Sequence, residues 1–184
     1  MTEQPSSHDA APAPPSHEML PLITLAVEHV FDTLTREPAF TPTLLAVTAD
    51  DQRGMWPIPE LTPENAAEAV GAISPTPARA VAVFDGEVQT PLGPRLAIAI
   101  EAFDASRPRS TRLVVEYARA VPGTDLGPRL TGEPQVVAEG PNPLAPPPRR
   151  RYRQEARAAR AAAAAKAQAE AAAGAGAPQP RQER

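Results

Sequence analysis

The residues of this chain that could take part in acid–base chemistry are carboxylates rather than thiols or histidines. The chain has 184 residues and no cysteine, which excludes thiol nucleophiles, disulfides and cysteine-ligated metals. Two of its three histidines, His8 and His17, fall in a proline-rich N-terminal stretch. The third, His29, lies at the margin of an apolar helical face without the partner that general-base catalysis requires. We therefore expect no catalytic histidine.

Three carboxylates, Glu101, Asp104 and Glu116, lie in or at the end of two predicted strands. Glu101 and Glu116 fit positions on one face of a sheet, where facing carboxylates repel unless solvent, an arginine or a bound group separates them. The candidate arginine partners are Arg95, Arg112 and Arg119. A salt-bridged surface is the favoured interpretation, and an enzyme that relies on these carboxylates alone is an alternative.

Motifs for cofactors and metals are absent from the sequence. It contains no HExxH, P-loop, GxGxxG, nucleophile-elbow or calcium-loop spacing. We therefore expect no cofactor, no metal and no enzymatic activity.

The single tryptophan, Trp56, stands in a short segment bounded by Pro57 and Pro59. Proline is tolerated at the edge of a sheet but not in its centre, so residues 55–58 are predicted to form an edge strand. Trp56 has two interpretations. It could cover the margin of a core that has few aromatic residues, or it could contact a protein partner, because tryptophan is enriched at interface hot spots.

A basic stripe near the C-terminus is the most unusual feature of the sequence. Four arginines are spaced 4, 4 and 3 residues apart, which places them on one face of a predicted helix. Together with their basic neighbours they are Arg149, Arg150, Arg151, Arg153, Arg157, Arg160 and Lys166. Such a stripe can follow a phosphate backbone without reading bases, so nonspecific association with nucleic acid is an alternative function. The other interpretation is a solvated, low-complexity extension, because no base-reading module accompanies the stripe.

The elements that position these residues follow from apolar spacing. A 3–4 repeat predicts a helix from Leu20 to Pro38, and Thr62-Pro63-Glu64 is typical of a second helix start. Strands are predicted at 43–48, 55–58, 79–89, 94–104, 111–120 and 134–139. The expected fold is α+β: helix, strand, a short strand, helix and then four strands. They form an antiparallel sheet of four to six strands with both helices on one face.

Composition divides the chain into five parts. Residues 1–18 are predicted to be a disordered arm, 19–140 a single domain and 141–148 a proline-rich linker. Residues 149–173 are predicted to form a solvated, alanine-rich basic helix, and 174–184 a disordered tail. The net charge of −4 conceals an acidic domain and a basic tail.

The order of elements, with the segments PARAVAVFDGEV, GPRLAIAIEAFD and VVEYARA, resembles a widespread group of small bacterial proteins with no assigned activity. The resemblance covers about residues 20–140 and implies the fold but no functional residues. With no signal peptide and no apolar stretch long enough for a membrane, we expect a cytoplasmic protein that does not contact membranes. The favoured function is a non-enzymatic protein-interaction module with a basic electrostatic tail and an unknown protein partner.

Overall fold

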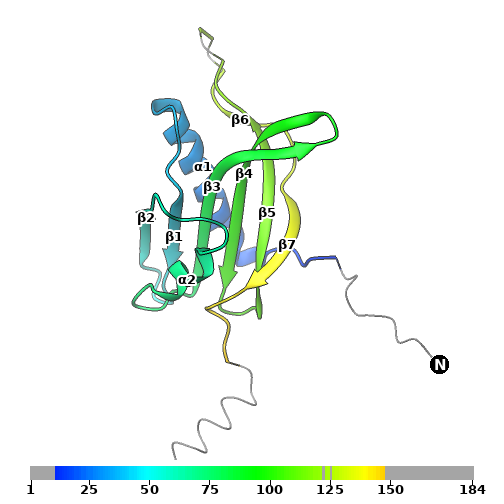
Figure 1. Cartoon of the computed structure of the whole chain (residues 1–184). Helices are drawn as coiled ribbons and strands as arrows, with labels where there is room; N and C mark the ends of the chain where they lie inside the picture. The colour runs from blue at the N-terminus through cyan, green and yellow to red at the C-terminus, as the bar shows by residue number, and fades with distance from the viewer. Residues whose placement is uncertain (1–10, 122, 125, 148–184) are drawn as a thin grey trace, which may run out of the picture. The chain divides into compact units, whose positions relative to one another are not determined.

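Residues 11–121, 123–124 and 126–147 are described by a computed structural model (Figure 1). All structural statements below concern these residues. The first part of the predicted arm, the basic helix at 149–173 and the predicted tail at 174–184 lie outside them. The described residues up to Pro146 belong to one compact unit.

Two α-helices form where the sequence predicts them. Helix α1 spans Leu20–Arg36, follows the 3-10 turn η1 at His17–Met19 and ends before Pro38. Helix α2 begins later than the predicted start at Thr62-Pro63-Glu64 and spans Ala66–Gly71. The turn that precedes it is closed by reciprocal bonds: Thr62 N–H donates to Asn65 Oδ1 at 2.8 Å, and Asn65 N–H donates to Thr62 Oγ1 at 3.4 Å.

A single curled antiparallel sheet carries the rest of the fold. Its strands are β1 Thr43–Val47, β2 Arg53–Pro57, β3 Arg79–Thr90, β4 Gly93–Asp104, β5 Arg109–Ala118, β6 Arg129–Leu130 and β7 Gln135–Pro141. The order is β2-β1-β3-β4-β5-β6, and β7 also pairs with β5. The sheet therefore has seven strands instead of four to six. The unpredicted strand β6 has two residues, too few to produce an alternating pattern.

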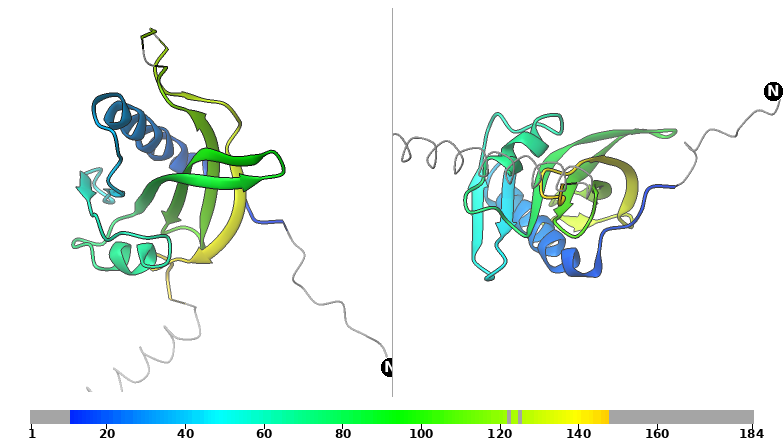
Figure 2. Two further views of the ribbon diagram at one scale, coloured as in Figure 1. Left: turned by 45° about the horizontal axis from the view of Figure 1, so that its top comes forward. Right: turned by 90° about the horizontal axis from the view of Figure 1, so that it is seen from below.

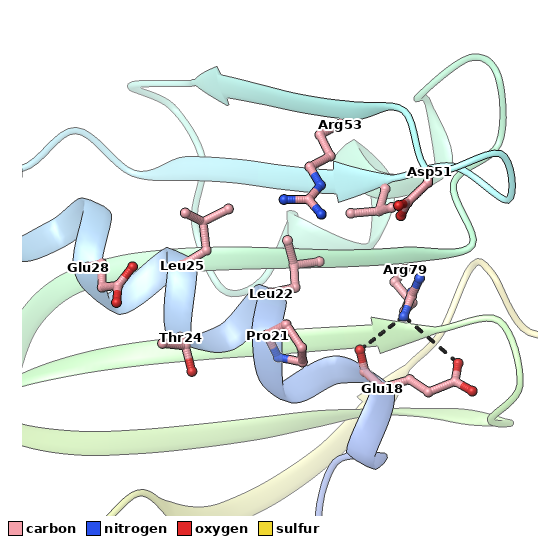
Figure 3. Close-up of a pocket in the computed structure, with 10 residues that line it drawn as sticks. Glu18, Pro21, Leu22, Thr24, Leu25, Glu28, Asp51, Arg53 and Arg79 are labelled. Atoms are coloured by element: carbon pink, nitrogen blue, oxygen red, sulfur yellow. Dashed lines mark hydrogen bonds and ion pairs between the residues drawn. The ribbon is translucent and has the colours of Figure 1, made fainter.

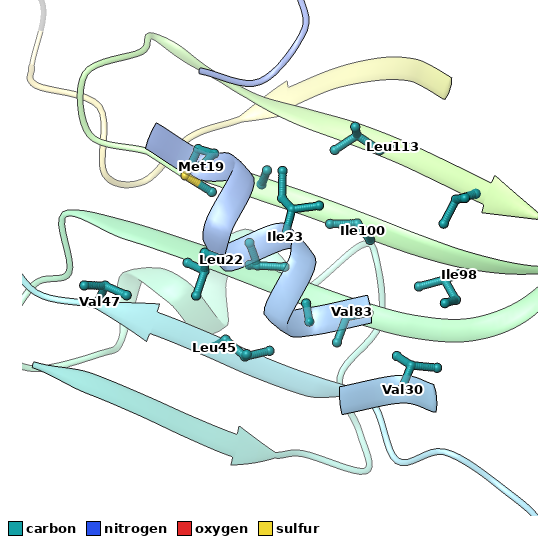
Figure 4. Packing of buried hydrophobic residues seen from close by; sticks show 14 of the residues in the cluster. Met19, Leu22, Ile23, Val30, Leu45, Val47, Val83, Ile98, Ile100 and Leu113 are labelled. Atoms are coloured by element: carbon teal, nitrogen blue, oxygen red, sulfur yellow. The ribbon is translucent and has the colours of Figure 1, made fainter. Parts of the chain in front are cut away.

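The prediction that both helices lie on one face of the sheet is wrong (Figure 2). Helix α1 packs on the face that carries Leu45 and Val83, which we call the α1 face (Figure 4). Helix α2 packs on the opposite face, with Leu44 and Phe84, which we call the α2 face. The physical reason is visible in β1, where all five side chains are buried. A strand that is apolar on both faces needs a cover on each.

Both ends of the domain extend beyond the predicted boundaries. Ser16, predicted to be in the disordered arm, donates its hydroxyl to Asp104 Oδ2 at 2.5 Å. In the predicted linker, Asn142 Nδ2 donates at 2.8 Å to the backbone oxygens of Asp104 and Arg107, and Leu144 is buried in the cluster beneath α2. The predicted start of the domain at residue 19 and its end at residue 140 are corrected accordingly. Short polar side chains at 16 and 142 tie both ends to the loop after β4.

Candidate functional site

The carboxylates that were considered for catalysis do not converge. Glu101 is only 2% exposed, and its Oε2 accepts from Arg112 Nη2 at 2.8 Å while its Oε1 accepts from Ser110 Oγ at 3.0 Å. Glu116 lies 3.7 Å from Arg95 Nη1 in a separate ion pair. The expected arginine partners are therefore confirmed for both glutamates. The Glu101 pair, however, is a buried structural contact and not part of a salt-bridged surface.

Asp104 is the last residue of β4 and precedes the loop that holds the ends of the domain. Burial by itself raises the pKa of Asp104, but hydrogen bonds from Ser16 and Ser106 and the charge of Arg107 outweigh it, so its pKa lies below the ordinary value. Across the described residues, no three His, Asp or Glu side chains are grouped so that they could hold a metal ion. The carboxylates are thus distributed among separate structural contacts.

Strand β2 ends the sheet on one side, as the prolines predict. Two bonds fix its hydrogen-bonding pattern: Thr48 N–H donates to the Gln52 carbonyl at 2.9 Å, and Ile58 N–H donates to the Pro42 carbonyl at 2.8 Å. Along two antiparallel strands, pairs of opposed residues alternate between pairs that are joined by backbone hydrogen bonds and pairs that are not. The register of β1 with β2 is continuous between these two bonds, so the alternation can be followed residue by residue. Gly54 and Trp56 therefore direct their N–H and C=O groups toward β1.

The intervening residues direct theirs away from the sheet. Arg53 and Met55 each present one outward N–H and one outward C=O, and Pro57 presents an outward C=O only. Pro57 removes no hydrogen bond between β1 and β2, because its missing N–H would lie on the free side of the strand. Of these three residues, only Arg53 and Met55 can therefore both donate and accept a backbone hydrogen bond at the free edge.

Trp56 lies on the α2 face of this edge, since its register partner is Leu44. It is 41% exposed and belongs to neither buried cluster. Its indole lies over Gly54, where a Cβ would clash with the ring. Trp56, Gly54, Ile73 and Pro75 line a hollow of about 120 Å³, which we call the Trp-side hollow. Trp56 thus lies at the free edge, as its interpretation as a partner contact requires.

A larger hollow of about 510 Å³ lies on the α1 face, between α1 and the end of the β1–β2 hairpin (Figure 3). We call it the helix-side hollow. Its apolar walls are Pro21, Leu22, Leu25 and Val47, and its charged rim is Glu18, Glu28, Asp51, Arg53 and Arg79. The hollow exists because α1 lies over β3, β4 and β1 rather than β2.

The two arginines of the helix-side hollow are not equivalent. Arg79 Nη1 donates to the Glu18 backbone oxygen at 3.1 Å and lies 3.9 Å from Glu18 Oε2. Arg53 forms no ion pair with any residue that the structure describes, and its guanidinium points into the hollow (Figure 3). An unpaired arginine beside free backbone groups can bind a peptide that carries an acidic side chain.

The opposite end of the sheet is formed by β6 and β7, which both pair with β5. Strand β7 joins β5 through a register shift between Arg112 and Leu113, and a bulge of this kind disfavours further pairing. The N-terminal segment also reaches this end, where Ala13 N–H donates to Glu139 Oε1 at 3.0 Å and Thr111 Oγ1 donates to the Ala13 oxygen at 3.4 Å. Strand β2 is thus an end of the sheet with free backbone groups and a hollow beside each face.

Sequence reasoning found part of this site. It identified Trp56 and the edge strand, but it missed Arg53, Met55 and Leu25. Which residues direct their backbone groups outward depends on the register with β1, and the prolines at 57 and 59 are the only local signal of a free edge. The basic residues from Arg149 to Lys166 lie outside the described residues.

Comparisons with family models, curated proteins and solved structures give no match for this chain. Within the described residues, no helix has the length and apolar character needed to cross a membrane.

Proposed function

We propose that this chain is a non-enzymatic protein-interaction module that binds an extended segment of a partner protein along β2. The observation that carries this proposal is the pair of outward N–H and outward C=O groups on Arg53 and Met55 at the uncovered end of the sheet. An extended segment that lies beside β2 can satisfy all four groups.

The surroundings of β2 support the binding of a partner segment at this edge. Side chains of an added strand point alternately to the two faces of the sheet, and β2 has a hollow beside each face. Met55 on the α1 face and Trp56 on the α2 face are 42% and 41% exposed, so both offer apolar area to a partner. Backbone pairing would supply binding energy, and the two faces would supply selectivity.

The alternative functions have less support. Each carboxylate considered for catalysis has its own arginine or hydroxyl partner, which favours a structural role for these residues. Association with nucleic acid depends on the arginines at 149–160 and on Lys166, so the described surface does not bear on it.

Selection from a randomised 12-residue peptide library on phage, with the full chain as bait, tests the proposal. Met55→Pro removes an outward N–H and leaves the bonds between β1 and β2 intact, whereas Met55→Leu keeps the N–H and serves as the matched control. Selected peptides should bind the wild type and Met55→Leu equally. Loss of a hydrogen bond together with the bulk of the ring should weaken binding to Met55→Pro about tenfold.

Thermal unfolding followed by circular dichroism would verify that Met55→Pro is folded. Peptides that bind Met55→Pro as tightly as the wild type would contradict strand addition, as would a library that yields no binder.

A further inference from the structure

We infer that the partner segment runs antiparallel to β2 and carries two apolar side chains followed by an acidic one. This inference rests on the proposed strand addition and specifies the chemistry of the partner. Antiparallel pairing is favoured because both outward groups of Arg53, and both of Met55, can then bond to one opposing residue. Read from its N-terminus, the partner meets Met55, then Gly54, then Arg53.

The first partner residue lies opposite Met55 on the α1 face. The side chains of a directly opposed pair are on the same face and in contact. Because Met55 is 42% exposed, an aliphatic side chain at this position would bury the thioether and itself. A charged side chain here would be desolvated without a counterion.

The second partner residue lies opposite Gly54 on the α2 face. Gly54 has no side chain to contact it, and the indole of Trp56 covers the space above this glycine. The partner side chain therefore meets Trp56, whose exposed area and ring favour an apolar or aromatic neighbour.

The third partner residue lies opposite Arg53 on the α1 face. Arg53 has no ion-pair partner among the described residues, whereas Arg79 in the same hollow is engaged by Glu18. An acidic side chain at this position complements Arg53. Glu28 and Asp51 also line the hollow and would repel further acids, which limits the preference to one position.

A second copy of this chain fits the edge less well. Antiparallel pairing of β2 with itself, centred on Gly54, would satisfy the same four backbone groups. It would, however, place an arginine beside each Met55 and bring two Arg53 side chains to diagonal positions with no acid opposite them. Charge complementarity therefore favours a different protein with an apolar-apolar-acidic segment.

Synthetic nine-residue peptides test this inference in titrations of the ¹⁵N-labelled full chain. They share Ser/Thr flanks and differ at the centre, which is Ile-Val-Glu, Ile-Val-Lys or Glu-Val-Ile. The wild type should prefer Ile-Val-Glu to either other peptide by about fivefold, since the pair is partly exposed. Arg53→Glu should reverse the preference between the Glu and Lys peptides. Arg129→Glu, a charge reversal on β6, should leave it unchanged.

Backbone methylation separates this inference from the proposed function. In the antiparallel arrangement the Glu N–H of the peptide points to β2 and the Val N–H points away. Methylation of the Glu nitrogen should therefore abolish binding, and methylation of the Val nitrogen should not. Sensitivity to methylation without a charge preference would overturn the inference and leave strand addition intact. Equal effects of the two methylations would contradict strand addition itself.

Two further outcomes also overturn the inference. One is the absence of shifts with Ile-Val-Glu at millimolar concentration. The other is a dimer in sedimentation equilibrium that Met55→Pro dissociates and Met55→Leu does not, because a second copy would then occupy the edge.

Discussion

The buried Glu101 is the side chain whose environment depends most on a single neighbour. Its charge is compensated by Arg112, which also donates to the Pro63 backbone oxygen at 3.3 Å and so links β5 to the segment before α2. Gly140 approaches so closely that a Cβ there would lie 2.8 Å from Glu101 Oε1. The carboxylate therefore has little room to reach water if the arginine is lost.

We predict that Arg112→Met lowers the free energy of unfolding by about 2 kcal/mol, because it leaves a buried carboxylate without a counterion. Adding Glu101→Gln to this variant removes the uncompensated charge and should restore part of the loss. Urea unfolding at pH 7 measures both. A change below about 0.5 kcal/mol for Arg112→Met, the range of ordinary surface substitutions, would show that the pair is not structural.

Asp104 should give the stability of the protein an acid dependence. Its pKa is lowered in the folded state, so its contribution is complete above the ordinary value of 3.8 and is lost as the pH falls through the folded pKa. Ser16→Ala removes one of the hydrogen bonds that lower this pKa. The variant should be less stable than the wild type at pH 7, and the difference should shrink below about pH 4. Urea unfolding across this range measures it, and a difference that does not vary with pH would contradict the role of the charge.

At the scale of elements, the strands could be predicted better than the faces they present. The strand predicted at 94–104 forms as β4, and the prolines at 57 and 59 predicted an edge strand. The apolar run of β1 indicates that both faces of the sheet are covered, but it does not indicate which helix covers which face. Which backbone groups of β2 point outward likewise depends on its register with β1, and the sequence does not indicate that register.

The close approach of Trp56 to Gly54 supplies a test of the edge geometry. Gly54→Ala puts a methyl group where the indole lies, so the ring must move, at a cost of about 1 kcal/mol. The emission of Trp56 should shift, and it is the single tryptophan of the chain. Gly86→Ala is the matched control, because a Cβ there meets nothing within 4 Å. Identical spectra for the wild type and Gly54→Ala would contradict the described position of the indole.

For the whole molecule, the sequence predicted the α+β class. Composition predicted a disordered arm at 1–18 and a proline-rich linker at 141–148, yet Ser16 and Asn142 form hydrogen bonds with Asp104 and the loop after β4. Composition reports how a segment behaves alone and carries no information about long-range hydrogen bonds. For the basic residues from Arg149 to Lys166, which lie outside the described residues, both predictions stand: a solvated extension, and contact with phosphate as the alternative.

Fragments with different boundaries should differ in stability. A fragment of residues 11–147 keeps both ends, whereas residues 18–140 lose the Ser16 hydrogen bond, the Asn142 bonds and buried Leu144. Loss of Leu144 burial alone removes about 1.5–3 kcal/mol. The shorter fragment should therefore unfold at a lower temperature or fail to fold. Equal midpoints in differential scanning calorimetry would restore the narrower boundaries that the sequence predicts.

Amide hydrogen exchange of the full chain, followed by NMR with and without a bound peptide from the phage selection, tests the central claim most directly. In the free protein the amides of Gly54 and Trp56 should be protected, because they donate to β1, and those of Arg53 and Met55 should exchange rapidly. On binding, the Arg53 and Met55 amides should become protected as well. If the peptide binds while both of these amides still exchange rapidly, β2 does not receive an added strand.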